Sequence, residues 1–79
     1  MEVKVKYLGM VSDALGLNSE NITFDKTISI SDFVSNLKQK YTNLNNLKFR
    51  VAINQKLLSE DTLISNGDEL ALLPPFAGG

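Results

Sequence analysis

The chain contains no cysteine and no histidine. Without cysteine it can form no disulfide and offers no thiol nucleophile, and without histidine it has no imidazole to act as a general base. The two residue types that bind transition metals best are both missing, so we expect no metal site. Any reaction that involves this chain therefore needs a different chemical group, with acid, base and metal supplied by a partner.

Basic clusters and long apolar runs are also missing. The formal net charge is −1, whereas a nucleic-acid binder normally presents a basic face, because phosphate contacts supply most of its affinity. The alternating segment Met1–Val5 lacks the apolar stretch of a signal peptide, and no run approaches the length of a membrane span. We expect no nucleic-acid partner, no membrane partner and a cytoplasmic location.

What is present is the composition of one small globular domain, with 79 residues of which 43% are hydrophobic and 22% charged. Alternating apolar and polar residues predict strands, and apolar residues at helical spacing predict helices. The expected order is strand, short helix, strand, long helix, strand, short strand and strand, at about 3–7, 9–15, 22–24, 29–41, 49–53, 56–58 and 69–73.

The long helix has the strongest signal, one apolar stripe formed by Ile30, Phe33, Val34, Leu37 and Tyr41. Ser29 followed by Asp32 resembles a capping box, with Asp in the position of Glu. Ile28 and Phe33 are spaced as a hydrophobic staple. Thr42–Asn46 is polar and rich in Asn, so we expect a loop there.

This order predicts an α+β fold in which a mixed sheet of four to five strands packs on one long helix plus a short helix. It fits the β-grasp, or ubiquitin-like, fold, and that analogy implies that the first and last strands lie side by side and parallel. The last strand has apolar residues on both faces, so it is central or its outer face meets a partner. We expect the domain to span residues 1–73 and an extended tail to span 74–79.

The tail carries the most specific chemical signal. Pro74 and Pro75 cannot continue a strand ladder and favour an extended path, so the tail should stand off the domain. Phe76 adds a large apolar side chain, whereas Gly78 and Gly79 are narrow enough to enter a channel in another protein. A partner that uses ATP could convert the Gly79 carboxylate to an acyl adenylate, open to attack by sulfur or nitrogen. The competing interpretation is a frayed end.

Three stretches resemble the MoaD family, the small sulfur-carrier subunit of molybdopterin synthase: Val51–Gln55, Gly67–Ala71 and Leu73–Gly79. Val5–Gly9 and Ala14–Gly16 are similar too, so the resemblance covers nearly the whole chain. Its specificity is concentrated in the C-terminal third. The family commonly has aromatic residues before the double proline and Val before Ala-Gly-Gly, where this chain has Leu72-Leu73 and Phe76.

The resemblance implies a cycle of sulfur transfer. A ubiquitin-activating-like enzyme, using ATP and Mg, adenylates Gly79, and sulfur replaces AMP to leave a thiocarboxylate. The tail then enters the large catalytic subunit of molybdopterin synthase, in a heterotetramer, and donates sulfur to a pyranopterin precursor of the molybdenum or tungsten cofactor. The chain itself would bind no cofactor and would not be catalytic alone.

The resemblance also assigns roles along the tail. Gly79 would accept the adenylate and the sulfur, and Gly78 would give access to the active site. Partner contacts would come from Pro74, Pro75, Phe76 and Ala77.

Other functions fit the same pattern. A thiamine-pathway sulfur carrier also ends in Gly-Gly, and a ubiquitin-like modifier would form isopeptide bonds with lysines. A passive interaction domain would keep full function after deletion of Gly78 and Gly79, whereas every carrier would lose it. Fold alone does not separate these functions, because function depends on the site and the partners.

Overall fold

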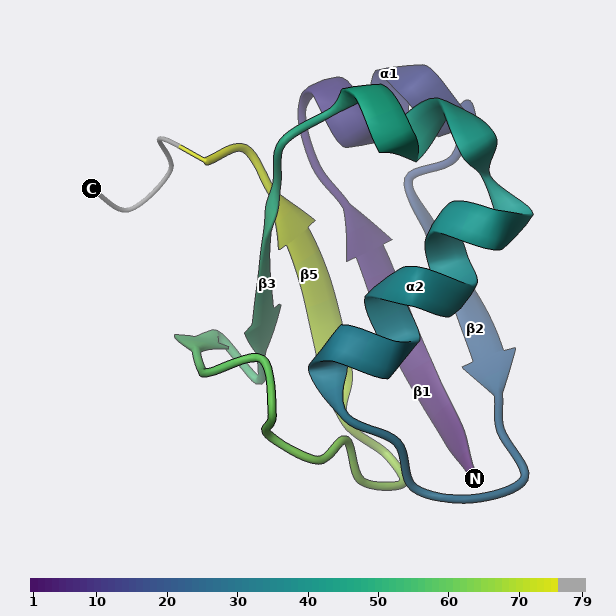
Figure 1. Ribbon diagram of the computed structural model, residues 1–79, viewed down its shortest axis with the longest axis vertical. Helices are drawn as coiled ribbons and strands as arrows, with labels where there is room; N and C mark the ends of the chain where they lie inside the picture. Colours follow the sequence, from purple (N-terminus) through teal and green to yellow (C-terminus); the bar gives the residue numbers. More distant parts are fainter. Residues whose placement is uncertain (76–79) are drawn as a thin grey trace.

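The protein forms a five-stranded mixed sheet with one long helix across one face (Figure 1). The computed structural model describes residues 1–75. The strand order is β2-β1-β5-β3-β4, with bounds Ser19–Thr23, Glu2–Tyr7, Glu69–Leu73, Arg50–Ile53 and Lys56–Leu57. Helices α1 and α2 span Met10–Leu15 and Ile30–Lys40. The predicted order of elements and the β-grasp fold are confirmed.

Strands β1 and β5 form the centre of the sheet. They pair in parallel, with Val5 opposite Leu70 and Tyr7 opposite Leu72, whereas the other neighbouring strands are antiparallel. Alternate residues of β1 and β5 point toward α2 and are buried. Strand β5 is therefore central, as one of the two predicted alternatives had it: its inner side chains, Leu70 and Leu72, fill the core, whereas Ala71 and Leu73 on its outer face are only half-buried.

Helix α2 covers the sheet with its apolar stripe. Ile30, Phe33 and Leu37 are buried, and the ring of Phe33 meets that of Phe24 edge-on, with centroids 5.8 Å apart. Ser29 begins the helix as predicted, since its hydroxyl accepts a hydrogen bond from the amide of Asp32 at 3.1 Å. This satisfies one of the amides that the first turn leaves without a helical partner.

The segment after α2 differs from prediction. Thr42–Asn46 is a 3₁₀-helix, η1, and not a loop. Its one apolar residue, Leu44, is completely buried, and the side-chain amide of Asn43 donates to the carbonyl of Ala14 in α1 at 2.8 Å. The burial of a single leucine thus outweighs the loop preference of the polar, Asn-rich residues around it.

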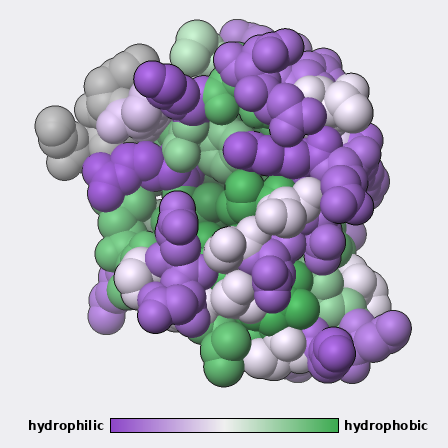
Figure 2. All heavy atoms as spheres, in the orientation of Figure 1, coloured by the Kyte–Doolittle hydropathy of each residue, from purple (hydrophilic) through white to green (hydrophobic). Residues whose placement is uncertain are grey.

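Two tight turns follow their sequence signals. Asn54 and Gln55 both have positive φ, 49° and 71°, and join β3 to β4 as a two-residue hairpin. Gly67, with φ of 86°, turns the chain into β5. Within residues 1–75 no helix has the length and apolar character needed to cross a membrane. Much of the surface in Figure 2 is polar, and its apolar areas include a hollow between α2 and β3.

Candidate functional site

The candidate site is the end of the sheet from which β5 continues into the tail. Strands β1 and β5 run toward this end, where α1 lies (Figure 1). The amide of Leu8 donates to the carbonyl of Leu72 at 3.1 Å. This hydrogen bond holds the start of the β1–α1 connection against the C-terminal end of β5. After Leu73, Pro74 is half-buried and Pro75 is exposed. The end of β5, from which the tail begins, is thus held by a neighbouring segment.

Within that segment, Gly9 lies against Pro74. It has φ of +58°, a backbone conformation that side chains with a Cβ rarely adopt. A Cβ added there would stand 3.0 Å from Cγ of Pro74. The proline ring therefore packs directly on the glycine backbone. On either side of Gly9 in the sequence, Leu8 and Met10 expose large apolar side chains beside the base of the tail.

The sheet face that α2 leaves uncovered continues this apolar surface. Ala71 and Leu73 are half-buried on this outer face of β5, and the register places Ala52 opposite Ala71 and Arg50 opposite Leu73. Lys6 lies beside Ala71 and forms an ion pair with Glu69 at 3.1 Å. That ion pair is exposed, so its contribution to stability is small. The outer face thus combines a short apolar strip with basic residues at its borders.

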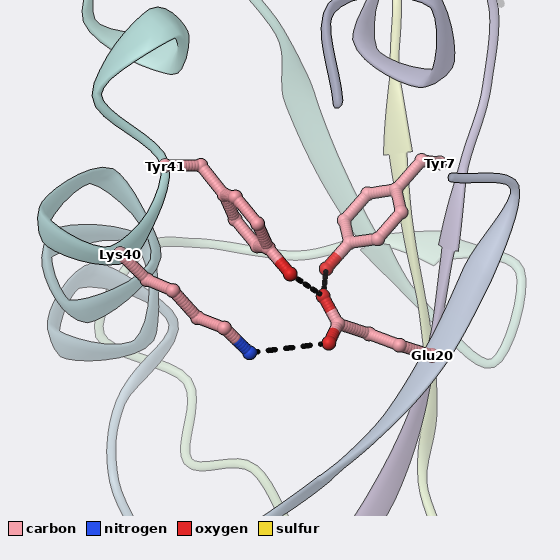
Figure 3. Close-up of polar contacts among 4 residues, drawn as sticks. All are labelled: Tyr7, Glu20, Lys40 and Tyr41. Carbon is pink, nitrogen blue, oxygen red and sulfur yellow. Dashed lines mark hydrogen bonds and ion pairs between the residues drawn. The ribbon is translucent and has the colours of Figure 1, made fainter. Parts of the chain in front are cut away.

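A polar cluster joins β1, β2 and the end of α2 around Glu20 of β2 (Figure 3). One carboxylate oxygen accepts hydrogen bonds from the hydroxyls of Tyr7 at 2.5 Å and Tyr41 at 2.8 Å, and the other accepts one from Lys40 at 3.2 Å. These bonds join β1, β2 and the end of α2. All four side chains find partners in one another, so the cluster fixes the helix on the sheet.

The environment of this cluster shifts its pKa values. Burial alone would raise the pKa of Glu20, but the hydrogen bonds from Tyr7, Tyr41 and Lys40 stabilise the carboxylate and lower its pKa below the usual value. Burial, and then the hydrogen bond to Glu20, raise the pKa of Tyr7 far above that of a free tyrosine. Near neutral pH the carboxylate is ionised and both phenols are protonated, which is the form the three hydrogen bonds require.

The predicted site residues fall into two groups. Pro74 and Pro75 follow the central strand, as expected, whereas Phe76, Ala77, Gly78 and Gly79 lie outside the described residues. Within residues 1–75 no group of three carboxylate side chains could hold a metal ion. The contact of Gly9 with Pro74 was not predicted. A glycine between a strand and a short helix is its only sequence signal, and that signal does not name the partner.

The chain matches the ThiS family over residues 5–79. The chain belongs to the ThiS family. It is also 30% identical, over 82 residues, to the molybdopterin synthase sulfur carrier subunit of Mycobacterium tuberculosis, in an alignment that covers 100% of this chain and 99% of that protein. The resemblance to MoaD is thereby confirmed, and this member of the ThiS family is a homologue of that sulfur carrier subunit.

Solved structures confirm the fold of this ThiS-family chain. A putative molybdopterin converting factor subunit 1 from Pyrococcus furiosus has a TM-score of 0.86, with 21% identity and 95% and 98% of the two chains covered. Small archaeal modifier protein 1 from Haloferax volcanii has a TM-score of 0.81, with 19% identity and 94% and 97% covered. A chain in the complex of subunits 1 and 2 of the molybdopterin-converting factor from Helicobacter pylori has a TM-score of 0.70 and 23% identity, and the match covers 100% of this chain and 100% of that chain.

Proposed function

We propose that this ThiS-family chain is the sulfur carrier subunit of a molybdopterin synthase, and that the carboxyl group of Gly79 carries the sulfur. The observation that supports it most is the similarity to the Mycobacterium tuberculosis sulfur carrier subunit over the full length of both chains. The family match also extends through Gly79, so the Gly-Gly pair belongs to the matched domain.

The chemistry requires two displacements at the Gly79 carboxyl group. First, a carboxylate oxygen attacks the α-phosphorus of ATP, forming the acyl adenylate and releasing pyrophosphate. Second, hydrosulfide attacks the acyl carbon, the carbon–oxygen bond to the phosphate breaks, and AMP leaves. The product is a thiocarboxylate, whose sulfur passes to a pyranopterin precursor. The activating enzyme and the large synthase subunit supply the catalytic groups, because this chain has neither cysteine nor histidine.

The described part of the chain would bind the partner and orient the tail. The contact between Pro74 and Gly9 would fix the base of the tail on the domain, and proline favours an extended path beyond it. Exposed Leu8 and Met10 offer apolar surface to a partner beside the tail. The Helicobacter pylori complex of subunits 1 and 2 supports a large-subunit partner for a protein of this fold. An ATP-dependent activating enzyme is the second partner that the chemistry needs.

The decisive experiment is intact mass spectrometry of the chain after incubation with ATP, Mg²⁺, sulfide and a ubiquitin-activating-like enzyme. We expect one species heavier by the difference between sulfur and oxygen, with the change localised to Gly79. A chain that lacks Gly78 and Gly79 is the matched control and should stay unmodified. The sulfur-loaded chain, mixed with the large subunit and the pyranopterin precursor, should return to its original mass as dithiolene sulfur forms.

A second candidate is a protein modifier, which the similarity of fold to small archaeal modifier protein 1 supports. In that case a lysine amine, and not hydrosulfide, displaces AMP from Gly79 and an isopeptide bond forms. Adducts on lysines of other proteins, without a thiocarboxylate species, would replace the sulfur-carrier proposal with this one. If a competent activating enzyme produces neither species, both functions are excluded.

A further inference from the structure

A groove of about 630 Å³ lies between α2 and the edge of the sheet formed by β3 and β4. Its floor is apolar and consists of half-buried side chains that pack against the core, namely Val34, Leu47, Phe49 and Val51. Figure 2 shows the hollow as green surface framed by purple polar residues. At one side stand Leu57 and Leu58, which are 41% and 43% exposed. Side chains of this kind are usually covered when a partner is available.

The same groove is bordered by a partly unpaired strand edge. The amide of Asn54 donates to Glu69 of β5, so the backbone groups of Val51, three residues earlier, point away from β5. On that side β4 ends at Leu57, which pairs with Ala52. The bridge between Ala52 and Leu57 turns the C=O of Val51 toward the N–H of Leu58, whereas within residues 1–75 the N–H of Val51 has no hydrogen-bond partner. The edge at the start of β3 is therefore partly open, and another strand can pair there.

The rim of the groove is basic. Lys38, Lys48 and Arg50 line it, with Glu60 as the only lining carboxylate. None of the three cations takes part in an ion pair among the described residues. The ammonium of Lys38 lies 5.7 Å from the centroid of the Phe49 ring and is thereby held at the rim. The groove is thus locally positive in a chain whose net charge is −1.

We propose that this groove binds an extended acidic segment of a partner protein, which adds as a strand to the partly open edge of β3. A main-chain hydrogen bond from the N–H of Val51 would set its position, and alternate apolar side chains would enter the groove toward Val34 and Phe49. Acidic side chains between them would face Lys48 and Arg50. Arg50, at the rim of the groove, pairs with Leu73 at the base of the tail, but the inference uses only described residues and does not rest on the sulfur-carrier proposal.

The test is a nuclear magnetic resonance titration of the full chain with a synthetic probe. The probe is a peptide of about six residues, the usual length of a strand, that alternates Val with Asp and is blocked at both ends. We expect shifts of amide signals at 49–51, 57–60 and 34–38, and slower hydrogen exchange at the Val51 amide. Two control peptides, one with Lys in place of Asp and one with a central Pro that interrupts the ladder, should bind much more weakly.

Variants then assign the contacts. Lys48→Glu and Arg50→Glu should each raise the Kd of the probe about fivefold, the size expected for one exposed charge pair. Lys26→Glu, an exposed lysine outside the groove, is the matched control and should leave the Kd unchanged. Leu58→Asp should raise the Kd about tenfold, whereas Leu17→Asp, at another exposed leucine, should not. Well-dispersed amide spectra establish that each variant is folded.

Four results would overturn the proposal. The first is that the amide signals of the groove residues do not shift when the probe peptide is present at a saturating concentration. The second is equal weakening by Lys26→Glu and Lys48→Glu, which would mean that only overall charge matters. The third is a set of groove shifts that grow with protein concentration when no probe is present, because a second copy of the chain would then be the occupant. Groove shifts without protection of the Val51 amide would exclude strand addition.

Discussion

The ring of Pro74 packs against the backbone of Gly9, so that a Cβ at Gly9 would stand 3.0 Å from Cγ of Pro74. This contact joins the connection after β1 to the first residue after β5. It lies at the base of the tail that the proposed function uses. A side chain at Gly9 would therefore act on both the stability of the domain and the direction of the tail.

We predict that Gly9→Ala lowers the free energy of unfolding by about 2 kcal/mol, from the positive φ together with the crowded proline. Urea denaturation measures this. Gly16→Ala is the matched control, since Gly16 has φ of +69° but nothing within 4 Å of an added Cβ. It should cost about 1 kcal/mol. In a Pro74→Ala background, Gly9→Ala should cost less than in the wild type but still more than Gly16→Ala, because Gly9 has ψ of −128° and lies outside the left-handed region that Gly16, with ψ of 21°, occupies. An unchanged cost would mean that the proline contact has no effect.

The Glu20 cluster leads to a second prediction. Glu20→Gln should lower the free energy of unfolding by about 2 kcal/mol near pH 7, because a charged acceptor of three hydrogen bonds is replaced by a neutral one. The Glu20 side chain is only 19% exposed, so water cannot replace all of these bonds. Glu60→Gln, at an exposed position, is the control and should change stability little.

The pH dependence has a definite sign. The pKa of Glu20 is lower in the folded protein than in the unfolded chain, so the ionised group stabilises the fold above the ordinary carboxyl pKa. That stabilisation is lost as the pH falls through the lowered, folded-state pKa. The stability difference between wild type and Glu20→Gln should therefore shrink between about pH 5 and about pH 2. A constant difference over this range would contradict the assignment.

Leu44 gives a third prediction, on the 3₁₀-helix. Leu44→Ala should lower the free energy of unfolding by about 3 kcal/mol, because it removes a completely buried leucine and leaves a cavity. Leu63→Ala, at a leucine that is 60% exposed, should cost well under 1 kcal/mol by comparison. Similar losses in thermal denaturation for both variants would mean that Leu44 does not anchor η1.

The fourth prediction concerns Phe76. Phe76→Asp should weaken binding to the large synthase subunit about tenfold or more without lowering the melting temperature, since a charge would replace an apolar tail residue at a partner surface. Isothermal calorimetry measures the affinity. Phe76→Val, the residue common in the MoaD family at this position, should retain most of it. An unchanged Kd for the aspartate variant would exclude Phe76 from the interface.

The fifth prediction concerns the reacting group. One alanine added after Gly79 should abolish adenylation, because the Gly79 carbonyl is then part of an amide and the carboxylate lies one residue further on. The assay is ATP–pyrophosphate exchange by the activating enzyme. The same alanine inserted after Ser59, in an exposed loop, serves as a control for added length and should leave exchange intact. Normal ATP–pyrophosphate exchange with the extended chain would mean that Gly79 is not the residue that is adenylated.

The elements that the sequence predicted well are those with strong local signals. The stripe and cap of α2 gave the helix from Ile30 to Lys40 with its Ser29 cap, and Asn54-Gln55 gave the β3–β4 hairpin. At one end of β2 and of β3 the prediction extended one residue too far, because Phe24 and Phe49 pack against the core from positions just outside these strands. At its other end, β2 begins at Ser19, three residues before the predicted start. Burial of a phenylalanine does not require pairing of its backbone.

Thr42–Asn46 was mispredicted for a different reason. Its four polar residues dominate the local pattern, and a single leucine carries no periodicity. Only the space between α1, α2 and the sheet makes Leu44 a core residue, because that space exists after the other elements have packed. Likewise, the Glu20 cluster gathers residues from β1, β2 and the end of α2, which no local pattern relates.

The sequence by itself determined the element order, the ubiquitin-like fold and the Pro-Pro-Phe-Ala-Gly-Gly tail, because helical periodicity, strand alternation and turn chemistry act between residues close in the chain. Tertiary structure alone decided the contact of Pro74 with Gly9, the burial of Leu44 and the open N–H of Val51 beside the groove. Each of these joins residues from separate elements, and their distance depends on the register of the sheet and the packing of helices on it. A one-dimensional pattern contains neither quantity.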